Sequence, residues 1–362
     1  KFAIKFLGIT GVTRLKDVSI FSVGSDIRDI TNASAYSQMI GFTRDEIKKY
    51  YIDYLTLAAS YENNCSVDKV TDTQIESMLD RLAKNYDGYC FDEDYEKKVF
   101  CTWSVNTFFQ TMVGKKKVQF GEYWYDNGGL PSILVNYLKT HELNIFEYLD
   151  KDKFLKVSSD DFKNPTALTT INQNVLMCQT GYLTLRSDLN KTSTVALGIP
   201  NGEIYKALNR LLANNIFKGN TDITDDYGRS LLEVGTADDI INLFNSALNS
   251  VSYDNYPIVS ESSGQNMLKL YLLGAHQKVL SEVHEAKGRA DLVVNTDNRR
   301  IVFEFKYAKN ETEAKSKLLD AVEQIKTRDY GNIVPNKTEL LRIAAVFNAD
   351  PKVRAFTEFQ LV

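Results

Sequence analysis

Apolar side chains recur every three or four residues near positions 40 to 110, which is the spacing of one face of an α-helix. Thr43 followed by Glu46 is a capping-box pattern, and the stretch after it predicts a helix of about four turns. Thr71 followed by Gln74 repeats the pattern before a second amphipathic stretch. The first part of the chain is therefore predicted to be mainly helical.

Later segments mix helix and strand patterns. GYLTL, from Gly181, is typical of a short strand, and EIYKALNRLLANNIF, from Glu203, has the apolar spacing of a helix. A polar segment around Pro257 marks the main boundary, beyond which the order is helix, strand, strand, helix, strand. We predict a mainly helical domain over 1–140, a mixed connecting region over 141–250 and a third domain over 251–362.

The run from Arg300 to Tyr307 carries two charged side chains among apolar ones. Successive side chains of a strand face opposite sides, so Glu304 and Lys306 are expected on one face. The turn signal NTDN separates this run from ADLVV, and pairing of the two as a hairpin would bring Asp291 to the same face. The pattern predicts two carboxylates and an ammonium group in one place.

Two carboxylates beside a lysine suit metal-assisted hydrolysis of a phosphodiester. Asp291 and Glu304 offer the hard oxygen ligands that Mg²⁺ prefers, and Lys306 could orient or help deprotonate the attacking water, or stabilise the developing charge. The alternative is a half-exposed hairpin with an ordinary Glu–Lys pair, which contributes little stability. Amphipathic helix patterns on both sides of the hairpin favour the site, because they indicate a sheet covered by helices.

The bulk composition limits the classes of protein that fit. With 362 residues and 43% hydrophobic content, the chain is long and apolar enough for two or more folded domains. The four cysteines form no CxxC pair, the three histidines complete no zinc-site spacing, and neither a membrane span nor a secretory signal is evident. We expect a cytoplasmic protein. The formal net charge of −4 gives no overall attraction to nucleic acid, so such contact would need a local basic surface or a metal.

Three motifs in the last third of the chain carry a resemblance to a known family. GRADL, the EFK of VFEFKYA and EQIKTRDY are similar to motifs of the PD-(D/E)XK nuclease superfamily, in particular the C-terminal domain of bacterial proteins that couple it to an AAA-ATPase-like domain. The resemblance implies a restriction-endonuclease-like α/β sandwich around a mixed sheet, with Asp291 and Glu304 as metal ligands and Lys306 as the catalytic lysine. It also implies Mg²⁺ or Mn²⁺ as cofactor and DNA or RNA as substrate.

The same resemblance implies further site residues around this core. Gln324 and Tyr330, on or after the helix that follows the hairpin, match auxiliary positions. A glutamate from a preceding helix often belongs to such sites; Glu261 is the candidate, and Glu282 in LSEVHEAKG is its rival for the role. The alternative for Glu261 is a charge in a polar linker with no part in catalysis.

The upstream region resembles the ATPase-like part of the same proteins. FLGITGVTRLKDVSIFSVGSDIRDIT is similar to a late ATPase strand and loop, and YDGYCF, CTWSVNTFF and FGEYWYDNGGLP are similar to motifs of the helical continuation. No GxxxxGK[ST] motif occurs, so this chain is not expected to hydrolyse ATP. We expect the first part of the ATPase core to lie outside the chain, with ATP acting only in an intact, longer protein. Aromatic side chains around YDGY and YWYDNGG are expected to close a core rather than to stack bases.

Two functions of different classes are consistent with these motifs. The first is a metal-dependent nuclease domain regulated by the ATPase-like module, of which a mainly helical remnant is present. The second is an ATP-switched binding or scaffolding protein whose nuclease-like domain is inactive. Convergence of Asp291, Glu304 and Lys306 around a metal-sized space would favour the enzyme, whereas a Lys306 that points into solvent away from Asp291 would favour the scaffold.

Overall fold

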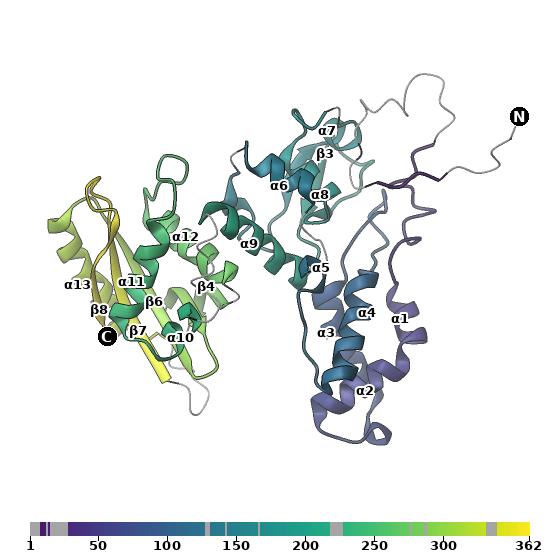
Figure 1. Cartoon of the computed structure of the whole chain (residues 1–362), viewed down its shortest axis with the longest axis horizontal. Coiled ribbons are helices and arrows are strands. Elements are labelled where there is room, and N and C mark those ends of the chain that lie inside the picture. The colour runs from purple at the N-terminus through teal and green to yellow at the C-terminus, as the bar shows by residue number, and fades with distance from the viewer. Residues whose placement is uncertain are drawn as a thin grey trace, which may run out of the picture. The chain divides into compact units, whose positions relative to one another are not determined.

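The computed structural model of the protein describes residues 8–11, 14, 28–126, 131–141, 143–165, 167–217, 227–275, 277–285, 288–330 and 339–362. The chain divides into two compact units, whose elements are labelled in Figure 1. Unit 1 covers 1–143 and 150–207, and unit 2 covers 144–149 and 208–362. Most of FLGITGVTRLKDVSIFSVGSDIRDIT, the stretch that resembles a late ATPase strand and loop, lies outside the described residues.

Unit 1 begins with a group of helices whose apolar faces form one core. These are α1 (Arg44–Tyr50), α2 (Ile52–Asn63), α3 (Asp72–Tyr86) and α4 (Thr102–Lys115), with a short 3-10 helix, η2 (Val67–Lys69). Thr43 and Thr71 cap α1 and α3 through the predicted capping boxes. The helix predicted after Thr43 is divided at Tyr51, whose backbone leaves the helical range (φ −115°, ψ 19°) while its ring stacks on Phe109 with the ring centroids 5.2 Å apart.

Unit 1 continues with short helices and a small sheet. The helices are α5 (Tyr123–Asp126), α6 (Ser132–Leu138), α7 (Ser159–Lys163) and α8 (Gln173–Gln179). The strands β1 (Leu155–Ser158), β2 (Thr184–Leu185) and β3 (Thr194–Gly198) form an antiparallel sheet in the order β1-β3-β2. Tyr86, Tyr89 and Tyr125 are buried, with at most 8% exposed, so the aromatic motifs close a core as predicted.

Unit 2 is built around a five-stranded mixed sheet, which confirms the predicted α/β class. Its strands are β4 (Lys278–Glu285), β5 (Gly288–Asn295), β6 (Arg299–Ala308), β7 (Glu339–Asn348) and β8 (Ala355–Leu361), in the order β4-β5-β6-β7-β8. Neighbouring strands are antiparallel except β6 and β7, which run parallel and lie on either side of α13 (Glu311–Arg328) in the sequence. β5 and β6 form the predicted hairpin, with Leu292 opposite Phe303.

Helices cover both faces of this sheet. The helices that contact the sheet besides α13 are α11 (Ala237–Leu248) and α12 (Glu261–Gly274). α10 (Tyr227–Val234) contacts α11, the 3-10 helix η3 (Ile145–Glu147) belongs to unit 2, and α9 (Gly202–Ile216) begins in unit 1 and ends in unit 2. Val302 of β6 packs with Ala321 and Ile325 of α13, whereas the next residue, Phe303, packs on Phe244 of α11. Figure 1 shows the strands between α13 and the pair α11 and α12. None of the described helices is long and apolar enough to span a membrane.

The last strand of the sheet is tied to α11, which lies before the predicted start of the third domain. The side-chain amide of Asn245 donates to the backbone oxygen of Phe356 (3.0 Å) and accepts from its N–H (2.8 Å). This pair of bonds satisfies two backbone groups of β8 with one side chain. α11 is therefore part of the layer that supports the sheet.

Candidate active site

The candidate site lies where β5 separates from β6. The β5–β6 ladder ends at the pair Leu292 and Phe303, although β6 stays paired with β7 as far as Ala308. Beyond the end of the ladder, the side chain of Asp291 accepts a hydrogen bond at Oδ2 from the N–H of Phe305 (2.9 Å). A carboxylate thus takes the place of a backbone carbonyl at this edge of β6. The opening leaves room for side chains from β6 and from a helix to meet.

Glu304 of β6 is fully buried beside this opening, with no exposed side-chain surface. Its Oε1 accepts a hydrogen bond from Lys306 Nζ (2.8 Å). Its Oε2 is buried and has no hydrogen-bond partner among the residues that the structure describes. Burial, followed by the charge of Asp291, raises the pKa of Glu304 to about 7. The site therefore holds a carboxylate with unused acceptor capacity and a raised pKa.

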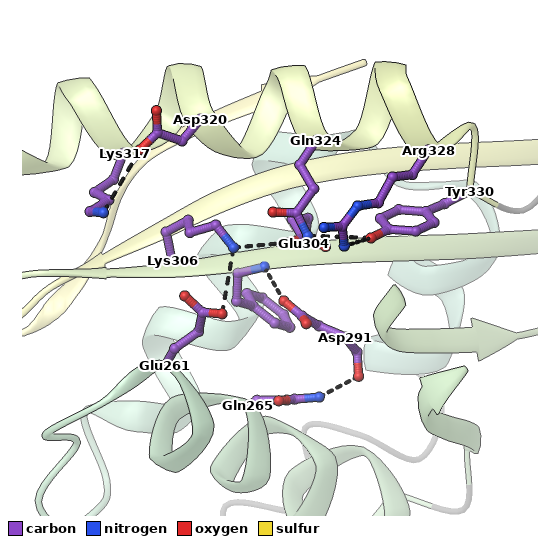
Figure 2. A network of polar contacts seen from close by, with 11 residues as sticks. Glu261, Gln265, Asp291, Glu304, Lys306, Lys317, Asp320, Gln324, Arg328 and Tyr330 are labelled. Carbon is purple, nitrogen blue, oxygen red and sulfur yellow. Dashed lines mark hydrogen bonds and ion pairs between the residues drawn. The ribbon is translucent and has the colours of Figure 1, made fainter. Parts of the chain in front are cut away.

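Lys306 lies on the same face of β6, and its side chain is only 14% exposed. Its Nζ is 2.8 Å from Glu304 Oε1 and 3.5 Å from Glu261 Oε1. Burial alone would lower the pKa of Lys306, but the hydrogen bond to Glu304 and the charges of Glu304, Glu261 and Asp291 raise it above its usual value. The ammonium group consequently keeps its proton in this arrangement. Figure 2 shows it directed toward both glutamates.

The first two turns of α12 supply two further side chains. Ser260 caps this helix, which places Glu261 at its first position, where the contact with Lys306 is made. One turn later, Gln265 is 6% exposed, and its Nε2 donates to the backbone oxygen of Asp291. Glu261 therefore lies in the site. Gln265 was not expected from the sequence, although its spacing of four residues from Glu261 puts it on the same helix face.

Glu282, the rival candidate for the role of Glu261, lies in β4. Its neighbours Ser281 and Val283 pair with Leu292 and Ala290 of β5, which places its backbone beside Asp291. The position of its side chain lies outside what the structure describes. Of the two candidates, only Glu261 has a described side-chain contact with Lys306.

The two predicted auxiliary residues contact one another at the C-terminal end of α13. Gln324 Nε2 donates to Tyr330 Oη (3.3 Å), and Arg328 Nη1 donates to the same oxygen (2.9 Å). Tyr330 is fully buried. In Figure 2, Gln324 and Arg328 extend from α13 toward β6. Arg328 was not expected from the sequence, since nothing in EQIKTRDY marks which basic side chain contacts Tyr330.

The donor set limits how a metal ion could be held. Among the described residues, no three His, Cys, Asp or Glu side chains form a group that could hold an ion. Asp291 and Glu304 would supply two oxygen ligands, and the remaining positions would be filled by water and by substrate oxygens. Mg²⁺ is commonly bound in this manner, through one or two carboxylates. The buried Glu304 Oε2 without a partner fits the requirement for an additional cation.

The part of the chain that contains this site matches a known protein family. Residues 260–357 match the family described as PD-(D/E)XK nuclease superfamily, and this span contains all six predicted site residues. Over 358 residues the chain is 22% identical to a protein of Azotobacter chroococcum mcd 1 named "Uncharacterized protein in vnfD 5'region". The alignment covers 96% of this chain and 62% of that protein, so the chain spans less than two thirds of its relative. The AAA-ATPase-like module predicted upstream stays a prediction, because the family match begins at residue 260.

Proposed function

We propose that the C-terminal domain hydrolyses phosphodiester bonds of nucleic acid with a divalent metal ion held by Asp291 and Glu304. One observation carries the proposal: Asp291, Glu304 and Lys306 converge where β5 leaves β6, and a buried oxygen of Glu304 has no hydrogen-bond partner among the described residues. The nuclease superfamily domain at 260–357 supports nucleic acid as the class of substrate.

The electrostatics of the two carboxylates support a cation between them. The charge of Asp291 raises the pKa of Glu304, which shows that the two groups repel each other when both are ionised. A bound Mg²⁺ or Mn²⁺ would reverse this effect by favouring both ionised forms. When bound, such an ion polarises the phosphate and lowers the pKa of a bound water, which are the two requirements of phosphodiester hydrolysis.

Lys306 is assigned the role of stabilising negative charge. Its raised pKa keeps the ammonium group protonated, so the role of base for the attacking water does not suit it in this arrangement. Glu304 and Glu261 hold Nζ from two directions, which fixes a positive charge beside the proposed metal ligands. A fixed cation of this kind stabilises charge that develops on the phosphate in the transition state.

The outer residues are assigned supporting roles. Glu261 orients the ammonium group of Lys306 from the N-terminus of α12. Gln324 and Tyr330 form an auxiliary pair at the end of α13, where the hydroxyl of Tyr330 accepts from Gln324. Such supporting contacts keep reacting groups in place and typically contribute about one to two orders of magnitude to activity or metal affinity.

For the rest of the chain we propose a regulatory role. Residues 1–140 would be part of an ATPase-like module and residues 141–250 a connecting region, which together control the nuclease-like domain at 251–362. ATP would act only in a longer protein that carries the missing P-loop. Cleavage by that longer protein is measured with and without ATP; equal rates would remove the regulatory role and leave the proposed nuclease site untouched.

Cleavage of labelled single- and double-stranded DNA and RNA, with Mg²⁺ or Mn²⁺, tests the proposed hydrolysis. The parent chain is expected to cleave at least one substrate, and Asp291→Ala and Lys306→Ala are each expected to lose at least about 10²-fold in rate. Lys317→Ala is the matched control, because Lys317 is a partly exposed lysine on α13 that pairs with Asp320. It should cleave like the parent.

Two results would contradict the proposal. Cleavage that survives in both Asp291→Ala and Lys306→Ala would mean that another site, or another protein in the sample, is responsible. Absence of cleavage by this chain and by the longer protein supplied with ATP would favour the binding or scaffolding protein with an inactive domain.

A further inference from the structure

Arg328 is a second basic side chain at the candidate site. It is the last residue of α13 and its side chain is exposed. Among the described residues, its guanidinium group has one hydrogen-bond partner, the Oη of Tyr330 (2.9 Å). This bond uses Nη1 and restrains the group, while the donors of Nε and Nη2 meet no partner among the described residues. A planar group held in this manner is ready for bidentate binding of an anion.

The charges of the site act on this guanidinium group. The hydrogen bond to Tyr330 and its charge raise the pKa of Arg328, and the charges of Glu304 and Asp291 contribute in the same direction. Arg328 is therefore close enough to both carboxylates to sense their charge. In Figure 2 it lies on the side of β6 that carries Glu304.

Gly288, the first residue of β5, makes room for the arginine. A Cβ added at Gly288 would lie 2.6 Å from Arg328 Cδ and 3.3 Å from its Nε, and its three nearest atoms all belong to Arg328. The backbone at Gly288 does not require glycine, since its φ is not in the left-handed region. A small residue is needed there because the side chain of Arg328 crosses the start of β5. The glycine of GRADL thus has a steric role in the site.

The charge balance around the site calls for such a cation. Glu304 and Glu261 both contact Lys306, and Asp291 brings a third carboxylate to the site, so these four groups together carry a net negative charge when all are ionised. A polyanionic substrate would be repelled by this excess, because phosphate binding depends on neutralisation by Lys and Arg side chains. Arg328 supplies positive charge at the solvent-facing side of the same cluster.

We infer that Arg328 binds a phosphate of the nucleic-acid strand next to the Asp291 and Glu304 pair, with Tyr330 and Gly288 holding it in position. This inference rests on the proposed function, since it names the residue that brings the backbone of the substrate to the metal ligands. Contact with a phosphate is independent of base identity, so the site is expected to bind strands of different sequence equally well through this residue.

The test is fluorescence anisotropy of a labelled oligonucleotide, in EDTA and over a range of KCl concentrations. Arg328→Ala is expected to weaken binding about tenfold, as for the loss of one charged hydrogen-bonded contact. The slope of log affinity against log salt concentration should fall by about 0.7 to 0.9, the value for one phosphate. Lys326→Ala is the control, because Lys326 is an exposed basic residue two positions earlier on α13. Its slope should equal that of the parent.

Gly288→Ala provides a second, independent variant. The added methyl group displaces the Arg328 side chain, so this variant should reproduce the binding defect of Arg328→Ala. The double variant should bind no more weakly than Arg328→Ala alone, because the methyl group then meets nothing. Additive defects of the two changes would contradict the proposed contact.

The outcomes separate this inference from the hydrolytic function. Equal affinity and equal salt slope for parent, Arg328→Ala and Lys326→Ala would overturn the phosphate contact, even if the parent cleaves nucleic acid through Asp291. Absence of oligonucleotide binding by the parent would overturn it as well. A binding defect of Arg328→Ala, with no cleavage by the parent or by the longer protein supplied with ATP, would keep the phosphate contact and reject the hydrolytic function.

Discussion

Each unit of the molecule contains one deeply buried glutamate whose pKa is raised to about 7: Glu203 in unit 1 and Glu304 in unit 2. Both are at most 2% exposed, and burial is the main cause of both shifts. In Glu203, Oε2 accepts from Ser104 Oγ (2.6 Å) and Oε1 accepts from the N–H of Trp124 (2.8 Å). In Glu304, one oxygen meets an ammonium group and the other has no hydrogen-bond partner among the described residues.

The difference shows that burial and a raised pKa do not by themselves mark a functional carboxylate. Glu203 uses both oxygens to join α4, α5 and α9, so its hydrogen bonds account for its presence in the core. Glu304 is buried to the same degree. Its Oε2, however, has no hydrogen-bond partner among the described residues, and the charge of a second carboxylate, Asp291, acts on it. The unused acceptor, and not the pKa, is what points to a ligand.

The largest expected difference between the two glutamates is in catalysis. Glu304→Gln should lower the rate of metal-dependent cleavage by about 10²- to 10³-fold, because it removes one of two charged ligands. Glu203→Gln should leave that rate within about twofold, because the hydrogen-bond partners of Glu203, Ser104 and Trp124, are not among the proposed site residues. Initial cleavage rates of both variants at saturating Mn²⁺ decide the point. A comparable loss in both would mean that Glu203 also supports the site.

Stability should show the reverse order. Glu203→Ala leaves the buried hydroxyl of Ser104 and the partly buried N–H of Trp124 without their acceptor, which should lower the free energy of unfolding by about 2 to 4 kcal/mol. Lys206→Ala, at an exposed position of the same helix, should change it by less than about 0.5 kcal/mol. Urea unfolding at pH 7 measures both. Glu304→Ala should lower the free energy of unfolding by less than Glu203→Ala does. An equal loss in the two variants would mean that the two glutamates do not differ in their contribution to stability.

The dependence of stability on pH should carry the signature of Glu203. Its carboxyl binds a proton more tightly in the folded protein, with a pKa of about 7, than in the unfolded chain, with a pKa near 4.5. The folded state therefore holds more protons between these values, and stability must fall as pH rises from about 4.5 to 7. The loss attributable to this group is at most about 3 kcal/mol. Urea unfolding of parent and Glu203→Gln at pH 5 and pH 8 checks it: the variant should lose less, and parallel curves would contradict the raised pKa.

The smallest effect expected is stabilisation by metal. At a Mn²⁺ concentration ten times its dissociation constant, binding to the folded protein alone adds about 1.4 kcal/mol to the free energy of unfolding. Parent and Glu203→Gln should both gain this amount, whereas Glu304→Gln should gain none. Thermal unfolding with and without Mn²⁺ supplies the measurement. An equal gain in all three proteins would place the ion elsewhere.

Features set by local sequence were predictable. The capping boxes at Thr43 and Thr71, the β5–β6 hairpin and the shared face of Glu304 and Lys306 depend on spacings of two to four residues, and all are present. The family match at 260–357 agrees with the motifs read from the sequence. The catalytic and metal-binding roles of the site residues stay predictions, because the positions of side chains do not by themselves establish what reaction they catalyse or which ion they bind.

Features that depend on tertiary contacts were not predictable. Gln265 was missed because its partner, the carbonyl of Asp291, lies 26 residues away in the sequence. Arg328 was missed because the space that its side chain crosses depends on a glycine of β5, 40 residues earlier in the sequence. The division of the first helix at Tyr51 likewise accompanies the stacking of its ring on Phe109, far along the chain.

The early end of the β5–β6 ladder has a spectroscopic consequence. Because the N–H of Phe305 is bonded to the carboxylate of Asp291 and not to a backbone carbonyl, its environment depends on the charge of that carboxylate. Any cation that draws electron density from Asp291 should shift the amide resonance of Phe305, while the amide of Ile301, which lies inside the ladder opposite Val294, should move little. The amide proton of Phe305 can therefore report binding of a cation at Asp291 without any cleavage of a substrate.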